Sequence, residues 1–250
     1  MVAGGAVKNP SVTHRKDEGI QYAGLKVHAP PGIHEDAMAI LMRHIKKGSH
    51  VIELGAGSGA FTKRMLDADL QVDCVDLDPP EWIEGSVEVI RRDLNLQDWK
   101  LPEGRYDAVV AIEVLEHVEN PSAFIRNARK IVKPGGVVLV TTPNVISVES
   151  RKRMLRSGEF AFFGIGELHH SGHLSILPYW LMEELVRKEG FEVLEMVFMG
   201  RQKLFFRQGR QWWKHLLIPP VEILLYLIGR RAPKEAAFST NLAMVIRPTN

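Results

Sequence analysis

Short apolar runs alternate along this chain with longer amphipathic stretches, which is the pattern of an α/β domain. The runs that predict strands are residues 51–54, 70–75, 87–90, 106–112, 137–142, 191–199 and 241–247. Apolar side chains at helical spacing predict helices over residues 35–47, from residue 61 onward, and over 121–132 and 181–188. This alternation predicts a doubly wound, mostly parallel sheet of seven strands.

Two regions lie outside the alternating pattern and divide the chain. Residues 1–34 are rich in glycine, proline and charge, and predict an irregular arm ahead of a domain over residues 35–250. Within that domain we expect a flap over residues 145–177, because its phenylalanines and glycines show no strand periodicity. A second irregular stretch over residues 200–240 separates the last two predicted strands, where a hairpin loop usually has two to five residues.

Composition excludes several classes of protein. A chain of 250 residues with 45% hydrophobic residues buries a sizeable core, and its formal net charge of +2 does not indicate nucleic-acid binding. The single cysteine, Cys74, lies inside an apolar run, so we expect a small buried side chain. The basic N-terminal stretch has no apolar segment of the secretory kind, and we therefore expect a cytoplasmic protein.

Candidate chemistry begins at the first predicted strand, which runs into a glycine-rich turn and then a helix. Gly55, Gly57 and Gly59 stand in that turn, where the absence of a Cβ lets a ligand approach the backbone. The pattern is ambiguous, because Gly55, Gly57 and Ala60 also fit the dinucleotide-binding fingerprint Gly-x-Gly-x-x-Gly/Ala. The glycines alone predict a nucleotide-type ligand of either kind.

Glu53, two residues before the first glycine, helps to decide between a dinucleotide and another nucleotide-type ligand. Its carboxylate would repel a pyrophosphate at the helix N-terminus and attract a cationic ligand. S-adenosylmethionine has no phosphate and carries an ammonium and a sulfonium beside its adenosine. The stretch resembles the first motif of the class I S-adenosylmethionine-dependent methyltransferases, an acidic residue followed by Gly-x-Gly-x-Gly. The resemblance implies this cofactor, with its methionyl end held by Glu53 and by the loop of Gly55, Ala56, Gly57 and Gly59.

The second predicted strand ends at Asp76, 21 residues after Gly55. This is the distance at which an acidic side chain meets the ribose in nucleotide-binding α/β folds, and a carboxylate accepts both ribose hydroxyl protons. We therefore assign Asp76, with the adjacent Leu77, to the cofactor. The alternative is a turn aspartate, which explains Asp78 well because two prolines follow it.

The resemblance extends to the third strand end and to the start of the first helix. The family has an aspartate at the third strand end that accepts the adenine amino group, and Asp93 with Leu94 matches by position. Asp93 taken alone equally fits a helix cap or a turn. A helix ahead of the first strand commonly closes the cofactor pocket in this family. For His34, at the start of that helix, we nevertheless expect a surface position.

The segment after the fourth strand carries Glu113, Glu116 and His117. Ligands of open parallel sheets lie at the carboxyl ends of the strands where the winding reverses, so Glu113 and His117 should lie near the reactive centre. The segment resembles the one in ubiquinone-pathway O-methyltransferases, where it borders cofactor and substrate. This implies a cofactor contact for Glu113 and a catalytic role for His117, although capping or packing explains the histidine equally well.

Three histidines gather in the predicted flap, at His169, His170 and His173. Histidine suits proton removal near neutral pH, so a hydroxyl substrate could lose its proton here. A metal site is the weaker hypothesis, because the segment has neither helical His-x-x-x-His spacing nor a nearby cysteine. An exposed loop with hydrogen-bonded histidines is the plainest alternative. Because related enzymes have a substrate-facing histidine here, we expect His170 or His173 to contact the acceptor, and no metal.

The stretch between the last two strands is basic, aromatic and apolar. Between its eight Lys and Arg residues lies an apolar run over residues 216–228 that is too short to span a bilayer. Such a composition suits a helix in a membrane interface, which predicts peripheral membrane contact through residues 201–234. Burial against the substrate pocket or in a homodimer contact is the alternative. Nucleic acid fits less well, because a phosphate-binding strip needs no long apolar run.

Taken together, the residues and the resemblance predict methyl transfer from S-adenosylmethionine to a small-molecule acceptor, at a hydroxyl oxygen. The family resemblance also predicts that the last two strands pair antiparallel. One alternative is an NAD-dependent oxidoreductase, which Glu53 and the lack of a Tyr-x-x-x-Lys motif disfavour. A non-catalytic lipid- or partner-binding protein on the same fold is the other.

Overall fold

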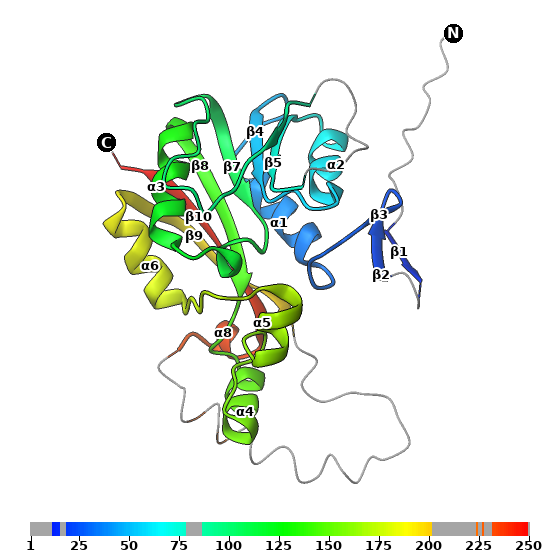
Figure 1. Cartoon of the computed structure of the whole chain (residues 1–250), viewed down its shortest axis with the longest axis vertical. Helices are drawn as coiled ribbons and strands as arrows, with labels where there is room; N and C mark the ends of the chain where they lie inside the picture. The colour runs from blue at the N-terminus through cyan, green and yellow to red at the C-terminus, as the bar shows by residue number, and fades with distance from the viewer. Residues whose placement is uncertain are drawn as a thin grey trace.

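The computed structural model describes residues 12–15, 19–78, 87–201, 224, 227 and 232–249. A seven-stranded sheet in the order β6-β5-β4-β7-β8-β10-β9 forms its centre (Figure 1). Its strands are β4 (His50–Leu54), β5 (Gln71–Asp76), β6 (Val89–Arg91), β7 (Tyr106–Ala111), β8 (Val132–Pro143), β9 (Phe191–Arg201) and β10 (Ser239–Pro248). β10 pairs antiparallel with both its neighbours, β8 and β9, and the other strand pairs are parallel. The predicted seven-stranded, mostly parallel sheet with an antiparallel last strand is confirmed.

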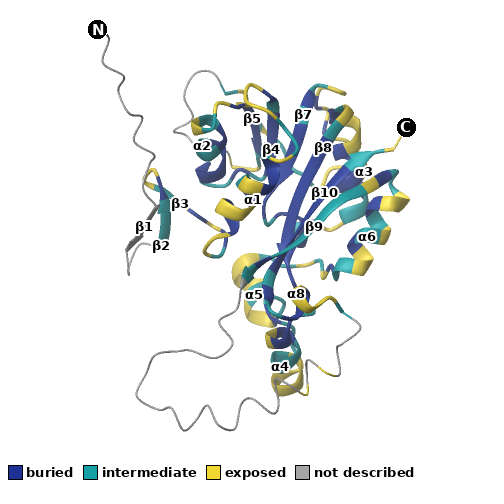
Figure 2. Ribbon diagram, turned by 180° about the vertical axis from the view of Figure 1, so that it is seen from behind, coloured by how far each residue is buried: buried dark blue, intermediate teal, exposed yellow. Residues whose placement is uncertain are grey.

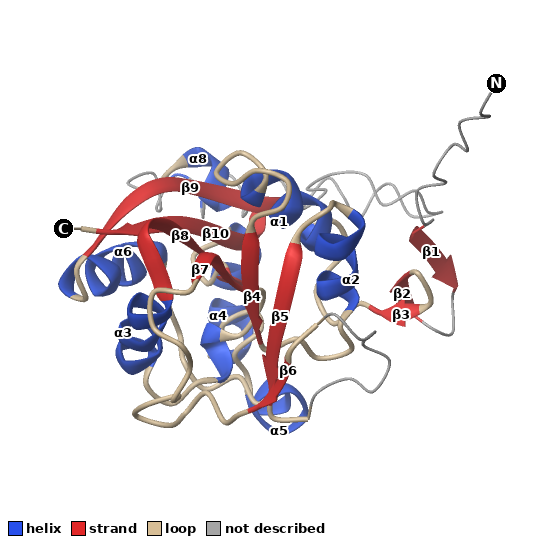
Figure 3. Cartoon of the chain, turned by 90° about the horizontal axis from the view of Figure 1, so that it is seen from above, coloured by secondary structure: helices blue, strands red, loops and turns tan. Residues whose placement is uncertain are grey.

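Helices cover both faces of this sheet. They are α1 (Ile33–Leu41), α2 (Ala60–Asp67), α3 (Pro121–Ile131), α4 (Val148–Ser157), α5 (Ile165–Ser171), α6 (Tyr179–Lys188) and α8 (Lys234–Ala237), with a 3-10 turn η1 (Leu115–His117). Figure 3 shows α3 and α6 on one side of the sheet and α1 and α2 on the other. Each face of the sheet has its own hydrophobic core. Successive residues of a strand point into opposite cores, so Ile52 packs on the α3 and α6 side and Val51 on the α1 and α2 side.

The order of the strands fixes where a ligand can bind. From β4 the chain winds outward through β5 to β6, and then returns so that β7 lies on the other side of β4. Such a reversal leaves a crevice at the carboxyl ends of the two strands that flank it. Here those ends carry Glu53 of β4 and, just after β7, Glu113.

The N-terminal arm is not irregular throughout, which corrects the prediction from sequence. β1 (Val12–Arg15), β2 (Gly19–Tyr22) and β3 (Leu25–Lys26) form a small antiparallel sheet (Figure 1). Tyr22 donates a hydrogen bond to Asp67 of α2 at 2.9 Å, and the guanidinium of Arg64 lies 3.9 Å from the centre of the Tyr22 ring. Strands of two to four residues are too short to leave a periodic signal in the sequence.

The predicted flap contains two helices, α4 and α5, joined by a polar network. Arg153 of α4 pairs with Glu159 at 2.9 Å and with both carboxylate oxygens of Glu167 on α5. Figure 2 shows how much of this region is exposed. The only buried residues of α4 are Val148 and Ser150. The helix therefore has no apolar stripe from which the sequence could predict it.

Most of the stretch between β9 and β10, namely residues 202–223, 225–226 and 228–231, lies outside the described residues. Only Leu224 and Leu227 of its apolar run are described, and both side chains are exposed. The predicted membrane or dimer contact through residues 201–234 therefore stays a prediction. None of the helices in the described ranges combines the length and the hydropathy that a membrane crossing requires.

Candidate active site

A cavity of about 880 Å³ lies at the carboxyl ends of the parallel strands, where the winding reverses. It brings together nearly all the side chains that the sequence singles out. The predicted residues in its wall are Glu53, Gly55, Ala56, Gly57, Asp76, Leu77, Asp93, Leu94, Glu113, His117, His170 and His173. Gly59 is the exception: it is buried and stands at the N-cap of α2 with a φ of 76°.

The glycine loop packs closely against the segment that follows β7. Gly55 has a φ of +78°, and a Cβ placed on it would come within 2.6 Å of a methyl group of Val114. Both the backbone conformation and the space therefore require glycine here. The loop's path is set by this packing, which leaves its backbone open to the cavity.

Asp76 is held in place by backbone N–H groups. Gly57 donates to one carboxylate oxygen at 2.7 Å, and Asp78 donates to the other at 2.9 Å. The first bond ties the end of β5 to the glycine loop. Because a carboxylate oxygen has further acceptor capacity, Asp76 can still accept hydroxyl protons from a ribose.

Glu53 lies deeper in the site, where its side chain is almost wholly buried. Thr62 of α2 donates a hydrogen bond to its carboxyl group. Burial raises the pKa of Glu53 to about 8, against the lowering effect of Thr62, and neighbouring Asp76 raises it further. The cofactor-free site therefore keeps Glu53 mostly protonated at neutral pH, and a ligand's ammonium group would favour its ionised form.

The third strand end supplies the remaining predicted cofactor residues. Asp93 accepts a hydrogen bond from the backbone of Asn95 at 2.9 Å, which is the geometry of an aspartate turn. The carbonyl of Leu94 accepts from the indole of Trp99 at 3.1 Å. Both Asp93 and Leu94 line the cavity, so the turn geometry and a contact with adenine are compatible.

Glu113 occupies a strained position at the end of β7, with a φ of 55°. Thr141 donates to one of its carboxylate oxygens at 2.7 Å, and Asn241 donates to the other at 2.6 Å. Burial raises its pKa to about 7, and these two hydrogen bonds oppose the rise. Protein groups thus already engage both carboxylate oxygens of Glu113.

Two of the predicted catalytic histidines meet across the cavity. The rings of His117 and His173 lie edge to face with centroids 4.8 Å apart, and Nδ1 of His173 lies 2.6 Å from the carbonyl of Phe162. Burial lowers the pKa of His117, as does His173, whereas backbone contacts with Gly172 and Ser171 raise it. His117 is therefore neutral at physiological pH and can accept a proton.

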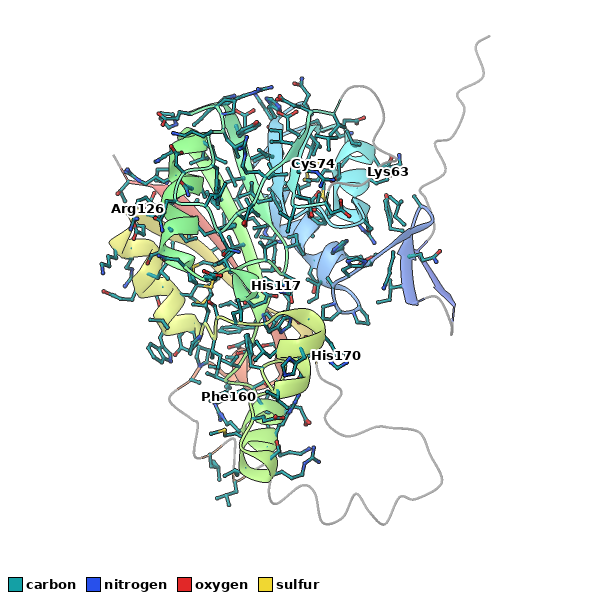
Figure 4. The ribbon with its side chains drawn as sticks, viewed as in Figure 1. Lys63, Cys74, His117, Arg126, Phe160 and His170 are labelled. Carbon is teal, nitrogen blue, oxygen red and sulfur yellow. The ribbon has the colours of Figure 1, made fainter. Side chains whose placement is uncertain are left out.

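His170 and His169 differ from this pair. His170 is exposed on α5, where its Nδ1 lies 2.8 Å from the carbonyl of Gly166, and it lines the edge of the cavity. Figure 4 shows His117 near the end of the sheet and His170 on the helix beside it. His169 does not belong to the cavity wall. Of the two acceptor-contacting candidates, His173 is thus the one that packs against His117.

Glu116, in the segment after β7, is a further residue of the cavity wall. Its side chain is fully buried, and neither carboxylate oxygen meets hydrogen-bond geometry with a partner in the described part of the chain. Burial raises its pKa well above the ordinary glutamate value, and Glu113 raises it further. Ligand atoms of Glu116, His117 and His173 lie within 4.8 Å of one another and could hold a metal ion. Sequence spacing does not reveal this grouping, because the flap supplies one member.

A second set of wall residues comes from the arm. Lys26, His28, Pro30 and His34 all line the cavity, and the carbonyl of Lys26 accepts a hydrogen bond from Ser58 in the glycine loop. The expectation that His34 lies at the surface is wrong, since its side chain is only 7% exposed. These residues follow no motif, and their only signal is their place just before or at the start of the first helix.

The sheet with its single antiparallel strand, the glycine loop and the acidic strand ends have the arrangement of class I S-adenosylmethionine-dependent methyltransferases. The chain belongs to the family of methyltransferase domains, whose family model matches residues 32–196.

Curated relatives support this assignment over part of their length. The chain is 34% identical over 105 residues to a ubiquinone biosynthesis O-methyltransferase of Xanthomonas oryzae pv. oryzae, a match that covers 39% of this chain and 44% of the relative. The corresponding protein of Xanthomonas campestris pv. campestris is 32% identical over 128 residues, which is 44% of this chain and 54% of the relative. The chain thus spans about half the length of the curated relatives it matches.

Solved structures share the fold at low identity. A SAM dependent methyltransferase from Archaeoglobus fulgidus superposes with a TM-score of 0.57 at 17% identity, over 85% of this chain and 93% of that one. The 1,6-didemethyltoxoflavin-N1-methyltransferase of Burkholderia thailandensis, solved with S-adenosylhomocysteine, superposes with a TM-score of 0.55 at 18% identity. The match covers 88% of this chain and 80% of that one.

Proposed function

We propose that this domain transfers the methyl group of S-adenosylmethionine to a hydroxyl oxygen of a small-molecule acceptor. The observation that carries the proposal is the cavity itself. On one side it has the glycine loop and the acidic strand ends, which suit a cationic adenosyl ligand, and on the other the paired rings of His117 and His173. The Xanthomonas relatives are described as O-methyltransferases, which supports oxygen as the methylated atom.

We assign residues of the cavity wall to three parts of the cofactor. Glu53 would hold the ammonium of the methionyl group, Asp76 the ribose hydroxyls, and Asp93 with the Leu94 backbone the adenine. The glycine loop suits a ligand that approaches the backbone, and Gly57 has a φ of +53°, which residues with a Cβ rarely adopt. When bound, S-adenosylmethionine supplies an electrophilic methyl group on its sulfonium.

The chain's own contribution to the reaction is alignment and proton removal. Holding the acceptor oxygen in line with the methyl carbon and the sulfonium removes most of the entropic cost of the encounter. His117 or His173 then accepts the hydroxyl proton as the new carbon–oxygen bond forms. The lowered pKa of His117 keeps it in the neutral form that this step requires.

An acceptor screen tests the proposal directly. The full chain is incubated with methyl-labelled S-adenosylmethionine and with separate panels of catechol-type quinone precursors, lipids and sugars. We expect label in a hydroxyl-bearing product of one panel. Calorimetric binding of S-adenosylmethionine without transfer to any panel would favour the non-catalytic alternative. Tight binding of NAD with no response to S-adenosylmethionine would contradict the proposal.

A further inference from the structure

One residue of the flap has a backbone conformation that residues with a side chain rarely adopt. Phe162 has a φ of 67°, in the left-handed region that favours glycine. It belongs to a tight turn in which the N–H of Phe163 donates to the carbonyl of Phe160 at 3.2 Å. A positive φ at the third residue alone makes this a type II turn, where that position usually holds glycine. Strain of this kind persists only where the surroundings enforce it, and it clusters at functional sites.

The turn is tied to the anchored end of the flap. The N–H of Ala161 donates to the hydroxyl of Ser150 at 3.1 Å, and Ser150 is fully buried in the first turn of α4. Val148, in the same helical turn, packs against Ala237 near the start of β10. The strained turn therefore has a fixed place relative to the sheet, although much of the flap is exposed.

The carbonyl of Phe162 determines which nitrogen of His173 carries the proton. Nδ1 of His173 lies 2.6 Å from this carbonyl oxygen. A carbonyl oxygen can only accept a hydrogen bond, so Nδ1 is the donor. The lone pair of the neutral ring is then on Nε2, which is the nitrogen that can accept a proton. Both Phe162 and His173 line the cavity.

Neighbouring rings hold the imidazole of His173 in this orientation. The ring of Phe163 lies tilted against it with centroids 5.4 Å apart, and the ring of His117 meets it edge to face at 4.8 Å. The other histidines suit proton removal less well. Burial lowers the pKa of His117, which weakens that ring as a proton acceptor. His170 bonds to the Gly166 carbonyl of its own helix and is exposed.

We propose that Phe162 is a positioning residue, whose left-handed backbone fixes His173 so that Nε2 removes the hydroxyl proton of the acceptor. This inference rests on the proposed function and assigns proton removal to His173, with His117 as a supporting ring. In the step itself, the acceptor oxygen bonds to the methyl carbon, the carbon–sulfur bond breaks to leave a neutral thioether, and the proton passes to Nε2. The imidazolium keeps its bond from Nδ1 to the carbonyl, which stabilises the new positive charge.

Two substitutions of Phe162 separate its backbone from its side chain. Phe162→Gly removes the ring but adopts a positive φ without strain, so the turn and its carbonyl stay in place. Phe162→Val keeps an apolar side chain, but a β-branched residue disfavours this φ, so the turn shifts. With the full chain and the acceptor found in the screen, we expect kcat to fall at least about tenfold in Phe162→Val and only about threefold in Phe162→Gly.

NMR of the full chain labelled with nitrogen-15 at histidine identifies the tautomer of His173 and needs no acceptor. We expect the proton on Nδ1 in the wild type and in Phe162→Gly, and a mixture of tautomers in Phe162→Val. His173→Gln alone should lower kcat as much as replacing both His117 and His173. Phe160→Val, in the same turn but outside the cavity wall, is the control and should change neither kcat nor the tautomer.

Three results would overturn the role of Phe162. They are an equal loss of kcat in the glycine and valine variants, a proton on Nε2 of His173 in the wild type, and transfer that stops on dialysis against a chelator. The first would show that the ring of Phe162 acts on the acceptor, and the last that His173 binds a metal ion. If no acceptor is methylated at all, the proposed function fails, whereas the NMR result still tests the bond between Phe162 and His173.

Discussion

The two walls of the cavity are built differently. The proposed cofactor wall consists of strand ends and a glycine loop, tied by short hydrogen bonds such as that from the backbone N–H of Gly57 to the Asp76 carboxylate at 2.7 Å. The proposed acceptor wall comes largely from the flap, which contributes Phe162, His170, Ser171 and His173 to the cavity. The flap is exposed, since Ile165 is 64% exposed and Leu168 39%. Hydrogen bonds tie it to the segment that follows β7. The Glu116 carbonyl accepts from the backbone N–H of Leu174 at 2.7 Å and of Ser175 at 3.0 Å, and the Val118 carbonyl accepts from the Ser175 hydroxyl at 2.7 Å.

This difference separates two tasks within one domain. A wall made from the sheet's own strand ends has its geometry fixed by the fold. It therefore suits binding of the methyl donor, which methyltransferases of this family have in common. A wall made from surface helices can change without unfolding the sheet, and therefore suits the choice of acceptor. The following predictions test that division, from the largest effect to the smallest.

Removing the histidine pair should affect the acceptor wall alone. In the double variant His117→Ala with His173→Ala we expect kcat to fall at least about a hundredfold, because proton acceptance is lost, while cofactor affinity stays the same. Steady-state kinetics and calorimetry measure the two effects. His169→Ala, which lies outside the cavity wall, should behave as wild type. A fall in cofactor affinity equal to that in kcat would show that the walls are not independent.

Asp76→Ala should affect the cofactor wall alone. The ribose loses an acceptor for two hydroxyl protons, so we expect S-adenosylmethionine to bind roughly a hundredfold more weakly in calorimetry. The fold should persist, as judged by circular dichroism, because Asp76 is only partly buried. The neighbouring Asp78→Ala is the matched control and should retain affinity. Unchanged affinity in Asp76→Ala would contradict the ribose assignment.

The buried carboxyl groups of Glu53, Glu113 and Glu116 should make the folded protein less stable as the pH rises. Burial raises the pKa of Glu53 to about 8 and of Glu113 to about 7, and raises that of Glu116 as well. Between the ordinary glutamate pKa and these values, the folded state holds more protons than the unfolded state. The free energy of unfolding of the cofactor-free protein should therefore decline from about pH 5 to pH 8.

Glu116→Gln removes one of these carboxyls and should flatten that decline by up to about 1.4 kcal/mol per pH unit. Urea unfolding at each pH measures it, and Glu119→Gln, at an exposed position nearby, should leave the slope as in wild type. Identical slopes in wild type and Glu116→Gln would show that Glu116 does not hold a proton in the folded state.

The smallest expected effect concerns the flap network. Arg153→Gln breaks the pairing of α4 with Glu159 and Glu167, a partly exposed network worth about 1 kcal/mol or less. The KM for the acceptor should rise severalfold, while cofactor affinity stays unchanged. Arg156→Gln on the same helix, at an exposed position, is the control. A change in cofactor affinity instead would show that the flap reaches the cofactor wall.

The cofactor wall could largely be predicted from the sequence, because its residues are local to strand ends. Glu53, the glycines, Asp76 and Asp93 each follow an apolar run, and parallel strands bring their carboxyl ends to one edge. Periodicity therefore predicts both the sheet and the meeting of these residues. Gly59 was predicted as a cofactor contact from its place in the glycine motif. It is instead the buried N-cap residue of α2 and does not line the cavity.

The parts that sequence did not predict depend on contacts between distant segments. His173 meets His117 only because the flap folds back over the sheet, and the burial of the Glu116 carboxyl likewise depends on contacts between distant segments. The arm's short strands lack periodicity, so nothing local showed that residues 26–34 would reach the glycine loop.

The sequence by itself thus determined the sheet, its winding and the cofactor edge, since spacing of two and of 3.6 residues encodes strands and helices locally. Only the tertiary structure decided the protonation of Glu53, the burial of His34 and the pairing of the two histidines. Burial and charge depend on which distant groups surround a side chain, and no local pattern carries that information.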